Sequence, residues 1–127
     1  MKKSKQSARP VHVAFLQSFS FAFQGIFFCL KTQHNARLHL ISTVLVLAAG
    51  AAFKISPADW RWLTVCIALV WFAELMNTAF EYLCDVIAPE FHNSVKRAKD
   101  IAAGAVLVCA AAACVIGILT FLPYLQS

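Results

Sequence analysis

Residues 60–85 read WRWLTVCIALVWFAELMNTAFEYLCD, a long apolar segment that carries acidic residues in its second half. About 20 predominantly apolar residues are enough to cross the hydrocarbon core of a bilayer. Trp60 and Trp62 stand at the start of the segment, and tryptophan side chains gather at membrane interfaces. We therefore place a membrane-spanning helix at residues 60–85.

The rest of the chain has the same character. Of its 127 residues 61% are hydrophobic and only 13% are charged, whereas soluble domains are near half apolar and a quarter charged. Two more spans are predicted at residues 38–55 and 101–122. Residues 11–31 hold many of the eleven phenylalanines and a polar stripe of Gln17, Ser20 and Gln24, which indicates an amphipathic helix in the membrane interface. The sequence thus predicts a single-domain, all-α membrane protein with one surface helix and three spans.

The basic residues predict the orientation in the membrane. Residues 1–10 form a basic tail, and more basic residues lie just before the first span and in a polar connection expected at residues 88–100. Only Lys54 and Arg61 of the eleven lie on the other side. The positive-inside bias therefore places the N-terminus in the cytoplasm and the C-terminus on the far side.

The formal charge of +5 and the five cysteines indicate no further class of function. No nucleic-acid recognition motif accompanies the charge, and a basic tail suits anionic lipid headgroups, so we expect no nucleic-acid partner. The cysteines form no CxxC pair, which favours packing over zinc binding or disulfides.

All acidic residues except Asp59 lie between Glu74 and Asp100. At about 100° per residue, Glu74, Asn77, Glu81 and Asp85 share one face of a helix. An ionised carboxylate that faced lipid at membrane depth would cost roughly 3 kcal/mol. We therefore expect this face to turn toward the helix bundle, a water-filled pocket or a metal ion.

Phosphoryl transfer from ATP to a lipid alcohol fits these residues. Carboxylate oxygens bind Mg²⁺, which bridges nucleotide phosphates, and another carboxylate can accept the proton of a lipid hydroxyl. Lys99 could meet phosphate oxygens from the interface. The sequence has no P-loop and no kinase-type glycine-rich loop, so the nucleotide needs another kind of site.

Three alternatives remain open from the residues. The acids could pair only structurally with basic residues, namely Arg37, Lys96 or Lys99. They could form the relay of a small ion or proton-coupled transporter. They could also bind a basic partner of a non-enzymatic membrane subunit.

Residues 74–107 read ELMNTAFEYLCDVIAPEFHNSVKRAKDIAAGAVL, with the pattern E-x-x-N-T-A-x-E-x-x-x-D, then E-x-H, then A-K-D. This resembles the signature of the prokaryotic diacylglycerol kinase family, which includes the undecaprenol kinases. The resemblance implies a homotrimer of the bacterial cytoplasmic membrane with active sites shared between subunits. It also implies transfer of phosphate from Mg²⁺-ATP to diacylglycerol or undecaprenol. The runs NARLHL and AKDIAAGAVL look closer to the undecaprenol kinases.

The resemblance also implies roles for the matched residues. Glu74 would be the general base, and Glu81 a ligand of the magnesium that carries ATP. Asn77 would lie beside them, while Lys99 and Asp100 would hold the nucleotide.

The remaining candidates for the nucleotide site are Asp85, His92 and Arg97. His92 is expected to shape the site by hydrogen bonding rather than to ligate a metal. Arg97 is either a solvated charge or a phosphate contact.

Residues 33–39, QHNARLH, resemble a family run E-x-N-x-R-x-H that precedes the first span. Gln33 stands where many members have a metal-binding acid. An amide oxygen can ligate Mg²⁺ but carries no charge, so we expect weaker metal affinity with activity retained. His39 is expected to orient a neighbouring group.

Overall fold

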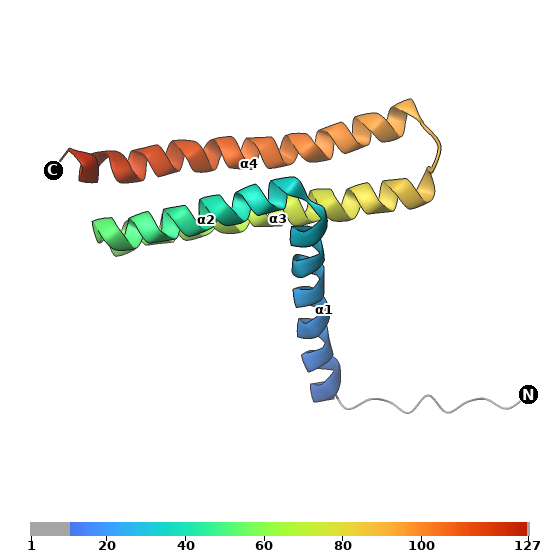
Figure 1. Cartoon of the computed structure of the whole chain (residues 1–127), viewed down its shortest axis with the longest axis horizontal. Coiled ribbons are helices and arrows are strands. Elements are labelled where there is room, and N and C mark those ends of the chain that lie inside the picture. The colour runs from blue at the N-terminus through green and yellow to red at the C-terminus, as the bar shows by residue number, and fades with distance from the viewer. Residues whose placement is uncertain (1–10, 127) are drawn as a thin grey trace, which may run out of the picture.

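The computed structural model describes residues 11–126, and this part of the chain forms four helices (Figure 1). These are α1 (Val11–Thr32), α2 (His34–Phe53), α3 (Pro57–Ile87) and α4 (Asn93–Leu125). Each is long and apolar enough to cross a membrane. The predicted all-α membrane class is confirmed. The basic tail predicted at residues 1–10 lies outside the described residues.

Helices α2, α3 and α4 run alongside one another, and α1 runs across them (Figure 1). Helix α3 is the centre of the bundle because it contacts each of the other three helices. The phenylalanines of α1 are exposed, among them Phe15, Phe19 and Phe23. If the three aligned helices cross the bilayer, α1 lies along its surface, and its exposed apolar side chains would contact lipid there.

The turn between α2 and α3 explains where these helices end and begin. Lys54 has a left-handed conformation with φ of 51°, which ends α2. The Ser56 hydroxyl then accepts a hydrogen bond from the backbone N–H of Asp59, and Pro57 occupies the first turn of α3. Both features favour the start of a helix.

Tyr124 joins this turn to the far end of α4. Its hydroxyl donates to Asp59 Oδ2 at 2.8 Å and accepts from the N–H of Ser56 at 3.0 Å. Hydrogen bonding from the hydroxyls of Ser56 and Tyr124 lowers the pKa of the Asp59 carboxyl. This contact fixes α4 to the start of α3, at the end of the bundle farthest from the α3–α4 connection.

The connection between α3 and α4 is shorter than predicted. We expected a polar segment over residues 88–100, but α4 already begins at Asn93. His92 caps the helix, because its Nδ1 accepts a hydrogen bond from the N–H of Ser94. Lys96 and Asp100 add an ion pair one turn apart, at 2.6 Å. The polar residues of this segment therefore lie on a helical extension of α4.

Candidate active site

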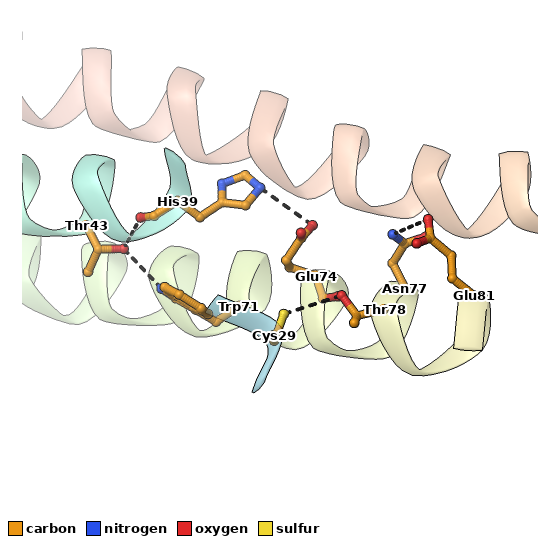
Figure 2. Close-up of polar contacts among 8 residues, drawn as sticks. All are labelled: Cys29, His39, Thr43, Trp71, Glu74, Asn77, Thr78 and Glu81. Atoms are coloured by element: carbon orange, nitrogen blue, oxygen red, sulfur yellow. Dashed lines mark hydrogen bonds and ion pairs between the residues drawn. The ribbon is translucent and has the colours of Figure 1, made fainter. Parts of the chain in front are cut away.

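Glu74 is the most deeply buried acidic residue of the described chain, with 1% of its surface exposed. It lies on α3 and points toward α2, where Nε2 of His39 is 3.8 Å from Glu74 Oε2 (Figure 2). Among the described residues, Oε2 has no hydrogen-bond partner. Glu74 thus faces the bundle interior, as we expected because an ionised carboxylate that faced lipid would cost free energy.

A pocket of about 250 Å³ adjoins this carboxylate. Residues from α2, α3 and α4 line it, including Asn35, His39, Glu74, Asn77 and Ala103. Asn77 Nδ2 donates to Glu81 Oε1 at 3.2 Å (Figure 2). Asn77 Oδ1 is buried and unbonded within the described chain. Buried polar atoms without partners are rare, and here two of them meet in one pocket that a polar ligand could complete.

Helix α1 supports the turn of α3 that carries Glu74. The Thr78 hydroxyl donates to the backbone carbonyl of Glu74 at 2.9 Å, and Cys29 Sγ lies 3.3 Å from Thr78 Oγ1. Cys29 is only 2% exposed. Sequence reasoning missed this role, because Cys29 is 49 positions from Thr78 and carries no motif.

Helix α2 is also hydrogen-bonded to α3 about one helical turn from Glu74 and His39. Trp71 Nε1 donates to Thr43 Oγ1 at 3.1 Å, and the Thr43 hydroxyl donates to the carbonyl of His39 at 2.7 Å (Figure 2). These two hydrogen bonds fix the position of α2 along the axis of α3. They therefore hold the part of α2 that carries His39 beside Glu74.

Farther toward the α3–α4 connection, Asp85 of α3 forms an ion pair with Lys99 of α4. The structure thus brings together two of the predicted nucleotide residues from different helices. Asp100 pairs instead with Lys96 on an exposed part of α4. Arg97 is exposed on the same extension. His92 caps α4, and its expected role in shaping the nucleotide site stays a prediction.

The residues present fit a magnesium ion that arrives with nucleotide better than a resident metal. Within the described chain, no three His, Cys, Asp or Glu side chains are grouped to hold a metal. Mg²⁺ commonly uses one or two carboxylates together with substrate phosphates and water. Glu81 offers one half-buried carboxylate. Gln33 lies at the start of α2, one turn after Cys29, where its backbone N–H bonds the Cys29 carbonyl.

Comparison with known proteins identifies the family. Residues 20–121 match the family model described as prokaryotic diacylglycerol kinase. The chain is 39% identical over 111 residues to an undecaprenol kinase of Bacillus subtilis, covering 87% of this chain and 90% of that protein. It is 35% identical over 127 residues to a diacylglycerol kinase of Synechocystis, covering 99% of this chain and 73% of that protein.

These matches cover the three aligned helices and the whole acidic face of α3. They do not favour a transporter or a non-enzymatic subunit, because both curated relatives are named as kinases. The chain belongs to the prokaryotic diacylglycerol kinase family and is a membrane lipid kinase.

Proposed function

We propose that this protein transfers the γ-phosphoryl group of Mg²⁺-ATP to the hydroxyl of diacylglycerol or undecaprenol. The reaction takes place at the cytoplasmic face of the bacterial inner membrane. The observation that carries the proposal is the buried Glu74 carboxylate, which lies within the bundle beside a pocket and has an unbonded oxygen. An acid in that position can meet a hydroxyl that approaches from the membrane.

Glu74 is the general base of the proposed step. It accepts the proton of the lipid hydroxyl, whose oxygen forms a bond to the γ-phosphorus while the bond to the β-phosphate oxygen breaks and ADP leaves. His39, whose Nε2 lies 3.8 Å from Glu74 Oε2, orients the carboxylate. The unbonded Asn77 Oδ1 lies in the same pocket and can accept a hydrogen bond from a bound water molecule.

The nucleotide is assigned to the face of α3 and α4 nearer the connection. Lys99, beside Asp85, supplies a positive charge for phosphate oxygens. Glu81 and Gln33 are the proposed protein ligands of magnesium, and Asp100, His92 and Arg97 lie around the nucleotide. Bound Mg²⁺ would neutralise charge on the phosphates.

We also propose that the protein is a homotrimer in which neighbouring subunits share active sites. The pocket beside Glu74 holds about 250 Å³, whereas ligand pockets usually hold about 300–1,000 Å³. One chain therefore encloses less space than a nucleotide and a lipid headgroup need. A neighbouring subunit would complete the site.

The test is transfer of label from ATP to lipid by the purified protein in detergent with magnesium, with diacylglycerol and undecaprenol offered separately. Glu74→Gln keeps the shape of the side chain but cannot accept the proton. We expect transfer to fall by about 10²-fold or more, with ATP binding retained.

Asp59→Asn is the matched control, because it makes the same chemical change at the start of α3, about 22 Å along the helix axis from Glu74. It should leave transfer in place. Full transfer by Glu74→Gln would remove Glu74 as the base, and binding of ATP without transfer to any lipid alcohol by the unaltered protein would refute the function.

A further inference from the structure

An apolar groove runs between α2 and α4, with α3 as its floor. Its volume is about 700 Å³. Leu38 and Val46 of α2, Leu63 and Val70 of α3, and Ala113 and Gly117 of α4 are among the residues that line it. The α4 residues that line its first half have small side chains, so α4 leaves that half of the groove deep: Ala110, Ala113, Cys114 and Gly117.

The groove is continuous with the pocket of the active site. Leu38, His39 and Ala110 line both hollows. His39 therefore stands where the apolar groove meets the pocket that contains Glu74. A molecule whose hydroxyl reaches Glu74 can lay its apolar part directly into the groove.

The dimensions of the groove favour one long chain. Its α4 side extends from Ala110 to Leu125, which is about 22 Å at 1.5 Å per residue. One leaflet of the hydrocarbon core is about 15 Å deep, so the groove continues past the membrane midplane. A volume of about 700 Å³ over that length gives a mean cross-section of about 30 Å². A narrow cross-section over this length suits one extended chain lying along the groove.

We propose that this groove binds the single polyprenyl chain of the lipid alcohol, with the alcohol group at Glu74 and the chain directed toward Leu125. The inference rests on the proposed kinase function and narrows its acceptor. An ordinary acyl chain ends within its own leaflet and would leave the far part of the groove empty. A polyprenyl chain is long enough to fill it.

Gly117 lies about midway along the α4 side of the groove and controls its depth there. A Cβ at this position would meet no atom within 4 Å, so a larger side chain fits without disturbing the backbone. Leucine there would occupy the groove about 10 Å beyond Ala110. Val115 lies about 200° around the helix from Gly117 and does not line the groove. It is 56% exposed, and Val115→Phe adds as many carbon atoms as Gly117→Leu.

The experiment measures KM for two prenols in the full-length protein: undecaprenol, and geraniol, whose chain ends before Gly117. Gly117→Leu should raise KM for undecaprenol about tenfold, the effect of two displaced methylenes. It should leave KM for geraniol unchanged. Val115→Phe should change neither value.

Three results would overturn the proposal while leaving the kinase function intact. One is an equal change of KM for both prenols in Gly117→Leu. Another is an unchanged KM for undecaprenol in this variant. The third is transfer to diacylglycerol with none to undecaprenol. A lower particle mass of Gly117→Leu in detergent, together with an equal loss for every acceptor, would assign the groove to a second copy of the chain instead.

A binding measurement separates this proposal from the kinase function. A photoactivatable polyprenol should cross-link to the segment 113–117 of α4 without ATP, and unlabelled undecaprenol should compete with it. Cross-linking without transfer would refute the kinase function alone. Transfer to undecaprenol with cross-links only outside the groove would refute the groove alone.

Discussion

At the scale of single residues, Glu74 combines burial with an incomplete set of contacts. The residue is 1% exposed, and His39 Nε2 lies 3.8 Å from its Oε2. Leaving a buried carboxylate oxygen unbonded costs free energy. A substrate hydroxyl can supply the missing hydrogen bond to Glu74. The unbonded oxygen is therefore already in place to accept the hydroxyl proton when the substrate arrives.

Gln33→Glu tests the departure from the family pattern. A carboxylate at this position adds the negative charge that an amide lacks, so magnesium should bind more tightly. We expect the magnesium concentration for half-maximal transfer to fall about tenfold, a usual size for a single metal-site partner. The measurement is a magnesium titration of lipid phosphorylation.

His34→Glu is the control for this titration, because it places the same charge one residue away on an exposed position. An unchanged magnesium requirement in Gln33→Glu would show that residue 33 does not ligate the metal. Equal shifts in both variants would assign the effect to general charge.

At the scale of elements, close packing of Trp60 on Gly50 joins α2 to the start of α3. A Cβ at position 50 would lie 2.7 Å from Cη2 of Trp60 and 3.1 Å from Cδ1 of Ile55. Gly50→Ala must therefore move the tryptophan ring or separate the helices. We expect a net loss of about 1–2 kcal/mol in the free energy of unfolding, seen as a lower Tm in detergent.

Gly104→Ala provides the matched comparison on α4, where a Cβ meets nothing within 4 Å. This variant should gain up to about 1 kcal/mol from the helix propensity of alanine. A similar gain in Gly50→Ala would mean that Trp60 shifts at little cost.

The contact of Tyr124 with Asp59 predicts how the bundle responds to acid. Hydrogen bonds lower the pKa of the Asp59 carboxyl in the folded protein. Its stabilising contribution is therefore present above the unfolded pKa and is lost as the pH falls through the folded value. Tyr124→Phe should lower Tm at neutral pH, and the difference from the unaltered protein should shrink below about pH 4.

Thermal unfolding at pH 7 and below about pH 4 checks this prediction. Tyr82→Phe is the control, since it removes a tyrosine hydroxyl from an exposed site near the other end of α3. A Tm difference that stays constant across the pH range would contradict the role of the ionised Asp59.

At the scale of the whole molecule, the three aligned helices place the α3–α4 connection and the C-terminus at opposite ends of the bundle (Figure 1). The positive-inside bias predicts that the connection lies in the cytoplasm. A C-terminal fusion to alkaline phosphatase should therefore be active, because that enzyme needs the oxidising far side. A fusion after Glu90, in the connection, should be inactive, and the reverse pattern would contradict the orientation.

The class of fold was predictable from the sequence, and so was the helix face that the acidic candidates share. Long apolar runs determine helices in a membrane, since only helices and closed barrels satisfy the backbone there. The spacing of Glu74, Asn77, Glu81 and Asp85 places them on one face because the helix repeat is fixed. The length of the α3–α4 connection was predicted wrongly, because local capping by His92 extends α4 through a polar segment.

Only the tertiary structure decided which residues surround that face. The contacts of Cys29 with Thr78, of Trp71 with Thr43 and of His39 with Glu74 join different helices. Their sequence separations follow no helical period, so no local pattern reveals them. The groove between α2 and α4 arises in the same way, because its depth depends on how far apart two helices pack and not on the residues of either one alone. Periodicity in the chain therefore determines which side chains share a face, whereas packing between helices determines what that face meets.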